Sequence, residues 1–184
     1  MPFYIRGFQV LIESNLIKLR PLETEDSNEF YDWASDRKIT QFSLSSYAYP
    51  QSKSDILKWL SDINKCTKTV SLGICSPDTG QLIGYAGIAS ISSLNRCGEF
   101  FILIGSKEHW GKGIGTEVTK LITEYGFKTL GLHRVELTAY ASNPSAIKAY
   151  EKAGYKHEGV KRQSGFRHGV FVDKVQMAAL CHEW

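Results

Sequence analysis

A glycine-rich segment at positions 110–116 (WGKGIGT) constrains the fold of this 184-residue chain more than any other feature. It follows an apolar run at 99–104 (EFFILI) and precedes a stretch whose apolar residues recur at helical spacing: Ile114, Val118, Leu121, Ile122 and Tyr125. A buried strand, a tight loop and a helix are therefore expected in succession. Glycines at alternate positions let backbone amides turn toward one point, and the helix start attracts anions such as a pyrophosphate.

The spacing of these glycines excludes two common phosphate-binding motifs. The Walker A pattern Gly-x-x-x-x-Gly-Lys-Ser/Thr is not matched, and neither is the dinucleotide fingerprint Gly-x-Gly-x-x-Gly. A tight turn whose glycines serve packing alone is the alternative to an anion site.

Strand-like and helix-like patterns alternate along the rest of the chain. We expect strands at 15–22, 70–75, 82–90, 99–104, 135–140, 155–160 and 170–180. Helices are expected from Glu25, from Ser52 or Ser54 (with Ile56, Leu57, Leu60 and Ile63 on one face), from the glycine-rich segment and from Asn143. Residues 36–49 and 165–169 are expected to be loops, and the strand at 99–104 is expected to be central and covered on both sides. This order predicts one α/β domain with a mixed sheet at 15–184, behind an N-terminal extension at 1–14.

Composition excludes several classes of function. The hydrophobic content of 42% argues against disorder, and a net charge of +3 without a run of basic residues argues against nucleic-acid binding. The longest apolar stretches have the length of strands, so we expect no membrane span and a cytoplasmic protein. Scattered cysteines and histidines, with no CxxC or HExxH pattern, predict neither disulfides nor a metal site.

Three stretches resemble the GNAT superfamily of N-acetyltransferases, in particular its ribosomal-protein-alanine acetyltransferase-like (RimJ/RimL-type) branch. They are GEFFILIGSKEHWGKGIGTE (98–117), ASNPSAIKAYEKAGYKHEG (141–159) and GVFVDKVQMAAL (169–180). The resemblance implies a mixed, mostly antiparallel sheet with a β-bulge or splayed central strands and about four flanking helices.

The resemblance also implies acetyl-CoA as co-substrate, in a cleft where the strands at 99–104 and 135–140 separate. Trp110 stands where the superfamily usually has Arg or Gln, and Asn143 matches an asparagine that meets the pantetheine arm. A helix cap is the alternative role for Asn143, compatible with the first. The expected acetyl-CoA residues are Ile102, Leu103, Ile104, Trp110, Gly111, Lys112, Gly113, Ile114, Gly115, Thr116, Asn143 and Lys152.

Two residues are expected to move protons. Tyr150 matches the family tyrosine that protonates the departing thiolate, although a tyrosine on an apolar helix face is otherwise a core residue. Glu99, at the start of the apolar strand, is the expected general base, directly or through water, with a salt bridge to Arg96 or Arg134 as the alternative.

Two segments, here called the acceptor lip, are expected to line the binding site of the acetyl acceptor. They are 36–49, which carries Phe42, Tyr47 and Tyr49, and 163–169, which carries Arg167 and His168. An acid-poor lip argues against a polycation. A protein N-terminal α-amine is therefore the expected acceptor. A polyamine, aminoglycoside or amino sugar, and a non-catalytic acetyl-CoA-binding module, are the alternatives; monomer and homodimer both stay open.

Overall fold

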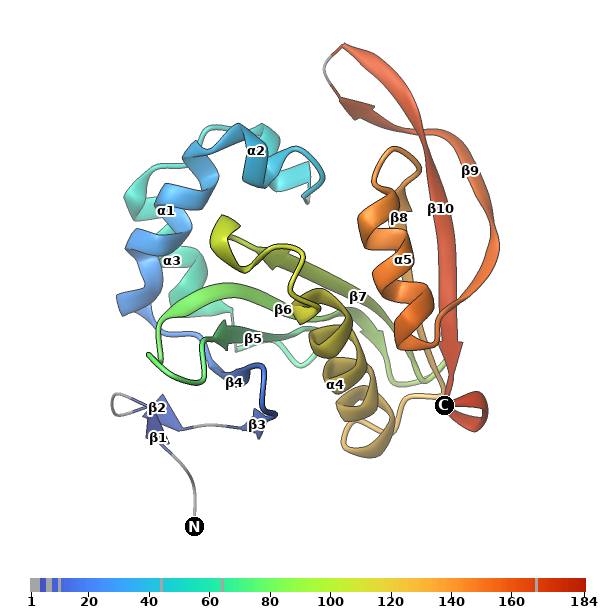
Figure 1. Cartoon of the computed structure of the whole chain (residues 1–184), viewed down its shortest axis with the longest axis horizontal. Helices are drawn as coiled ribbons and strands as arrows, with labels where there is room; N and C mark the ends of the chain where they lie inside the picture. Colours follow the sequence, from blue (N-terminus) through green and yellow to red (C-terminus); the bar gives the residue numbers. More distant parts are fainter. Residues whose placement is uncertain (1–3, 6–7, 10, 44, 64, 168) are drawn as a thin grey trace. The chain divides into compact units, whose positions relative to one another are not determined.

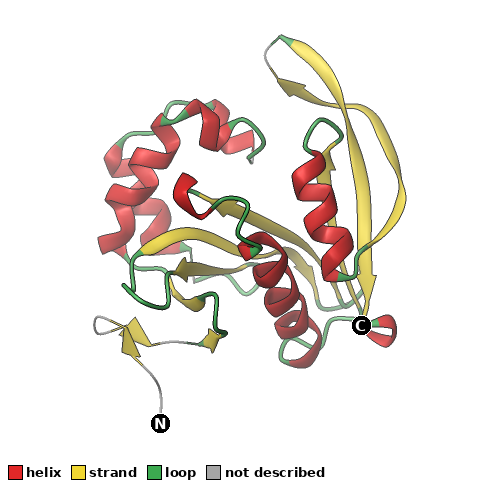
Figure 2. Ribbon diagram, viewed as in Figure 1, coloured by secondary structure: helices red, strands yellow, loops and turns green. Residues whose placement is uncertain are grey.

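The computed structural model describes residues 4–5, 8–9, 11–43, 45–63, 65–167 and 169–184 (Figure 1). The strands are β1 (Tyr4–Ile5), β2 (Phe8–Gln9), β3 (Ile12–Glu13), β4 (Lys18–Pro21), β5 (Val70–Cys75), β6 (Leu82–Ser92), β7 (Cys97–Ile104), β8 (Arg134–Tyr140), β9 (Lys156–Arg167) and β10 (Val170–Leu180). The α-helices are α1 (Ser27–Ser35), α2 (Arg37–Thr40), α3 (Lys53–Asp62), α4 (Ile114–Lys128) and α5 (Pro144–Ala153). Short 3₁₀ helices are η1 (Thr24–Asp26), η2 (Ser45–Ala48), η3 (Lys107–His109) and η4 (Cys181–Glu183) (Figure 2).

In the described part of the chain, eight strands form one sheet in the order β3-β4-β5-β6-β7-β8-β10-β9. The pairs β3–β4, β4–β5, β8–β10 and β10–β9 are antiparallel, whereas β7 and β8 are parallel. A mixed, mostly antiparallel sheet with flanking helices confirms the expected fold class. Of the expected extension, 1–3, 6, 7 and 10 lie outside the described residues, β1 pairs with β2, and β3 already joins the main sheet.

The contacts divide the chain into two compact units, 1–87 with 102–114 and 88–101 with 115–184. In the first unit, Arg20 on β4 and Asp26 in η1 form a buried two-bonded ion pair, with Nη–Oδ distances of 2.9 and 2.6 Å. In the same unit, the Phe30 ring of α1 lies 5.0 Å from the rings of both Trp33 and Tyr85 between centroids. These contacts attach the first helix to the sheet.

Two expectations for the first unit are wrong. The expected loop at 36–49 contains α2 and η2, because the Asp36 side chain accepts a hydrogen bond from the Lys38 N–H and caps a short helix. Leu57 does not share the buried face of Ile56 and Leu60, since it is 42% exposed. Ser52, rather than Ser54, caps α3 through a capping box with Asp55.

In the second unit, α4 and α5 pack on the same face of the sheet. A Cβ at Gly126 of α4 would lie 2.6 Å from Ile88 Cδ1 and 3.4 Å from Val135 Cγ2, so this glycine permits close packing. On α5, the Tyr150 ring lies 6.1 Å from that of Phe100. The other face, here called the polar face, carries residues that the strand registers place together: Glu99, Glu136, Thr138, Tyr140, Lys174 and Gln176.

Two expectations for the strands of this region are also wrong. β7 is not covered on both sides, because Gly98 and Phe100 are buried whereas Glu99 is exposed and Phe101 is half-buried. The expected last-but-one strand, 155–160, extends to Arg167, so most of the expected loop at 165–169 is paired strand. Its backbone bends instead at Gln163, where φ is +50° and the N–H bonds the Asp173 carboxylate.

The buried Arg20–Asp26 pair supplies a stability prediction. We expect Asp26→Asn to lower the free energy of unfolding by about 3 kcal/mol, because it leaves a guanidinium buried without its counter-charge. Asp62→Asn, which breaks the exposed pair with Lys65, is the matched control and should change stability by less than about 1 kcal/mol. Urea unfolding measures both; equal effects would contradict the assignment.

Candidate active site

The glycine-rich segment leaves η3 and enters α4 with open space beside it. Gly111 and Gly113 have φ values of +73° and +82°, and a Cβ at either would meet no atom within 4 Å. Among the described residues, the N–H groups of Gly111, Lys112 and Gly113 donate no backbone hydrogen bond. The following N–H groups belong to the first turn of α4, where none has a partner within the helix. A run of available donors at a helix start suits a phosphate-bearing ligand.

Trp110 uses its side chain inside the protein. The indole Nε1–H donates to the Ile104 carbonyl at 2.9 Å, while 41% of the residue remains exposed. The aromatic residue in the superfamily's Arg/Gln position thus holds the end of β7 against the loop. Residues 102–104 are expected to offer backbone groups to acetyl-CoA, and one of these, the Ile104 carbonyl, already accepts a hydrogen bond from Trp110.

The parallel pairing of β7 and β8 is short. It joins Cys97 to Arg134, Gly98 to Val135 and Glu99 to Glu136, and among the described residues it includes neither Phe100 nor Phe101. β8 nevertheless continues to Tyr140, paired on its other edge with β10. Backbone groups of β8 that face away from β10 are thus left for another partner. The ladder opens where the sequence predicts that these strands separate.

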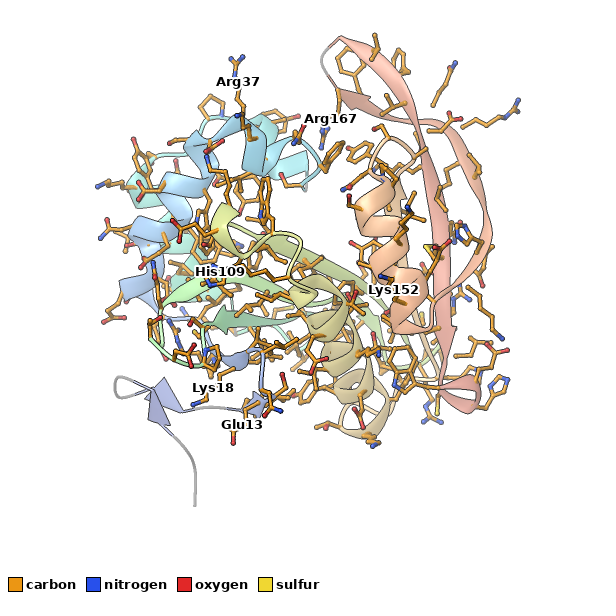
Figure 3. All side chains as sticks on the ribbon, viewed as in Figure 1. Glu13, Lys18, Arg37, His109, Lys152 and Arg167 are labelled. Carbon is orange, nitrogen blue, oxygen red and sulfur yellow. The ribbon has the colours of Figure 1, made fainter. Side chains whose placement is uncertain are left out.

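Asn143 caps α5. Its Oδ1 accepts from the Ala146 N–H at 3.3 Å, and Pro144 occupies the first helical turn. The helix-cap role is therefore confirmed, and the side-chain amide retains its two N–H donors. Lys152, in the last turn of the same helix, is exposed to solvent (Figure 3).

Tyr150 packs in an aromatic cluster but keeps its hydroxyl available. Its ring lies 6.1 Å from Phe100 and 6.3 Å from Tyr155, and its hydroxyl bonds no described residue. By contrast, the Tyr155 hydroxyl shares a 2.7 Å hydrogen bond with Thr123 and is buried. Desolvation raises the pKa of Tyr150 to about 12, so the phenol holds its proton throughout the neutral range.

Glu99 has neither of the ion pairs that the sequence offered as alternatives. Arg134 pairs instead with Glu136 and Glu158, and Arg96 Nε donates to the Gly131 carbonyl at 2.7 Å. No described residue forms an ion pair with Glu99, which is exposed on the polar face. The carboxylate is thus available to accept a proton.

The two segments of the expected acceptor lip belong to different units, 36–49 to the first and 163–169 to the second. In the first unit, Tyr47 hydrogen-bonds Tyr85 at 3.3 Å and lines a cavity of about 270 Å³ with Tyr31, Tyr49 and Pro50. Phe42 is 39% exposed. In the second unit, Arg167 ends β9 (Figure 3), and His168 lies outside the described residues.

Sequence reasoning missed one group of the polar face. Arg167 Cζ and Lys174 Nζ each lie 4.9 Å from the ring centroid of Tyr140. The available signal was the alternation of β10, in which Lys174 and Gln176 alternate with the buried Val175 and Met177. Lys174 was not singled out because lysines on a strand usually lie on a solvated face.

In the first unit, the open glycine-rich segment has the chemistry to hold a diphosphate such as that of acetyl-CoA. In the second unit, the interrupted ladder has a phenol and a carboxylate near it, groups that can donate and accept a proton. The fold and these groups define an acyl-CoA-dependent N-acyltransferase.

Comparisons with known proteins support the assignment to the N-acyltransferases. A family model described as an acetyltransferase (GNAT) domain matches residues 17–156. The chain belongs to this family: it is an N-acetyltransferase that uses acetyl-CoA.

An uncharacterized N-acetyltransferase p20 of Bacillus licheniformis is 25% identical over 91% of this chain and 94% of its own. Spermidine N(1)-acetyltransferase of Escherichia coli is 29% identical over 91% and 88% of the two chains. The fold matches the crystal structure of spermidine N-acetyltransferase from Vibrio cholerae in complex with CoA and spermine, with a TM-score of 0.82 and 24% identity over 92% and 98% of the chains.

Two features are absent from the described residues. They contain no helix whose length and apolarity suit a membrane crossing. Nor do they contain a group of three or more His, Cys, Asp or Glu side chains arranged to hold a metal ion.

Proposed function

We propose that this chain acetylates a primary amine of a small molecule. The similarity over nearly the whole length of a relative named for spermidine acetylation carries this proposal. It favours the small-molecule alternative over our expectation of a protein N-terminal amine. The RimJ/RimL-type branch stays a prediction from the sequence.

Backbone amides of the glycine-rich segment hold the pyrophosphate of acetyl-CoA in this proposal. Gly111 and Gly113 make room for the phosphates, and the start of α4 adds its dipole. Lys112 and Lys152 add exposed positive charge, and the Asn143 amide donates to the pantetheine arm. Ile102 and Leu103 supply further backbone groups, whereas the carbonyl of Ile104 is shared with Trp110. When bound, acetyl-CoA supplies the activated acetyl group.

Glu99 and Tyr150 perform the two proton transfers. The Glu99 carboxylate takes a proton from the amine, directly or through water, so that the nitrogen attacks as a neutral group. Tyr150 gives its proton to the departing sulfur. With the tyrosine pKa near 12 and an ordinary thiol near 8.5, complete transfer is uphill by about 5 kcal/mol. Transfer must therefore accompany C–S cleavage in surroundings that also desolvate the thiolate.

An acceptor panel tests the proposal. Thiol release from acetyl-CoA is measured with polyamines, amino sugars, aminoglycosides, amino acids and peptides with free N-termini. We expect turnover with small amines at a kcat/KM at least about tenfold above that of peptides. Preference for peptide N-termini would contradict the proposal.

The loop predicts a difference between two substitutions of equal size. Gly113→Asp should weaken acetyl-CoA binding by about 100-fold or more, because it places a negative charge beside the phosphates. Gly113→Asn is the control: asparagine tolerates a positive φ and is neutral, so it should lose less than about tenfold. Calorimetric titration with CoA measures both. Equal CoA affinities of the two variants would contradict the proposal that this loop binds the phosphates.

Tyr150 and Tyr155 provide a matched pair of hydroxyl deletions. Tyr150→Phe should lower kcat by about 10- to 100-fold with little change in acetyl-CoA affinity. The reason is that the substitution removes only the hydroxyl, which in Tyr150, unlike in Tyr155, is available to donate a proton. Tyr155→Phe should instead lower stability by about 1 kcal/mol through loss of the Thr123 bond, with kcat retained. Steady-state kinetics and thermal unfolding separate the two. Wild-type turnover in Tyr150→Phe would exclude it as the acid.

Glu99 is tested by a pH profile. Glu99→Gln should lower kcat/KM at pH 7, and the deficit should shrink as the pH approaches the pKa of the acceptor amine, where the amine deprotonates without help. Stability should be unchanged, since no ion pair is lost. Glu136→Gln, on the same face but paired with Arg134, is the control and should leave the profile parallel to wild type. A constant deficit at all pH values would contradict a general base.

A further inference from the structure

The polar face carries two cations against one ring. Tyr140 is buried, and Arg167 Cζ and Lys174 Nζ each lie 4.9 Å from its ring centroid. Cations favour such positions over an aromatic ring. The charge of Arg167 lowers the pKa of Lys174, so the two cations repel each other and the arrangement needs support from the surrounding structure.

The backbone of β9 fixes this arrangement. A Cβ at Gly165 would lie 2.5 Å from Tyr140 Cε1 and 3.3 Å from Lys174 Cε. The strand therefore passes directly over the ring and the lysine stem, and Lys174 pairs in register with Tyr140. The two cations belong to a packed surface rather than to mobile side chains in solvent.

Lys174 lies in a positive field. No described residue forms an ion pair with its ammonium. Burial lowers its pKa, and the charges of Arg167 and Lys161 lower it further. Glu99 is the one carboxylate that acts in the other direction. A bound anion would relieve the repulsion between the two cations.

The position of this pair relates it to catalysis. Glu99 is in register with Glu136, and Tyr140 follows four residues later on the same face of β8. That separation along a strand is about 13 Å between backbones, and a lysine side chain spans about half of it. A small molecule can therefore present an amine to Glu99 and an anionic group to Lys174.

We infer that the acceptor amine carries an anionic group, a carboxylate or a phosphate, which Lys174 and Arg167 bind while the amine lies near Glu99. This inference rests on the proposed function and narrows its substrate class. It separates this chain from polyamine acetylation, because a second or third ammonium group would face Lys174 and Arg167 with like charge. Lys174 and Arg167 are specificity-determining residues in this assignment.

A series of linear primary amines of one chain length tests the inference. The members end in a carboxylate, a phosphate, a neutral carboxamide or a second ammonium group. For the wild-type enzyme, we expect kcat/KM for the anionic amines to exceed that for the carboxamide by at least about tenfold, with the diamine the poorest substrate. The ratio of carboxylate to phosphate substrates shows which anion fits.

Variants assign the preference to this pair. Lys174→Met should reduce the anion-to-carboxamide ratio by about tenfold through a higher KM, with kcat changed less than about twofold. Lys174→Arg should keep the ratio, and Lys128→Met, an exposed lysine of α4, should leave all values unchanged. The KM for acetyl-CoA should stay at the wild-type value in all three.

The outcomes distinguish this inference from the proposed function. A wild-type preference for the diamine, or an unchanged ratio in Lys174→Met, overturns the inference and leaves small-molecule acetylation intact. Turnover of peptide N-termini alone contradicts the proposed function and overturns the inference with it.

Discussion

The early end of the β7–β8 ladder is the constraint on which the site depends. After three paired residues on each strand, the edge of β8 that faces away from β10 no longer has β7 as its partner. Unpaired backbone groups in a buried setting cost about 1–3 kcal/mol each, so such an edge favours a ligand with amide groups of its own. A pantetheine arm has that chemistry and binds as an added strand does. Under the proposed function, the interrupted ladder is where a sheet with a hydrophobic core on one face would admit the extended co-substrate.

Glu99 and Tyr150 are the two groups of the proposed proton transfers, and strand alternation places Glu99 and the partner of Tyr150 on opposite faces of β7. Glu99 points to the polar face, and the next residue, Phe100, points to the helix-covered face, where it contacts Tyr150. A base and an acid on opposite sides of an opened ladder suit a reaction in which an amine attacks from one side and sulfur departs toward the other. The surroundings of Tyr150 also suit its proposed role, since desolvation raises its pKa and the phenol stays protonated.

Much of this arrangement could be predicted from the sequence. Hydrophobic periodicity located α1, α3, α4 and the strands β5 to β8, because each has a strong pattern and a clear start or stop residue. The Asn143 cap, the glycine-rich loop and the separation of the central strands were likewise expected. The helix cap and the loop depend on local chemistry that a short window of sequence contains, whereas the separation of the strands was expected from the family resemblance.

The predictions that were wrong depend on distant or subtle contacts. α2 forms because one aspartate caps it, which a polar, irregular stretch such as 36–49 does not reveal. β9 extends to Arg167 because β10 pairs with it along its whole length, including across register shifts. The indole of Trp110 bonds the Ile104 carbonyl only because the loop folds back on the strand end. The free state of Glu99 follows from Arg134 having two other partners, which no pattern in the sequence shows.

The cation pair on Tyr140 shows how one fold can serve different acceptors. In the proposed reaction, the ladder opening and the glycine-rich segment serve the acetyl donor, whereas Lys174 and Arg167 serve the distal end of the acceptor. The side chains of the polar face are free to differ, because they lie on the side of the sheet that the helices do not cover. Lys174 and Arg167 on this face repel a second ammonium group and attract an anionic one, whatever the backbone around them. Resemblance of fold to a spermidine acetyltransferase is therefore compatible with an acceptor of opposite charge.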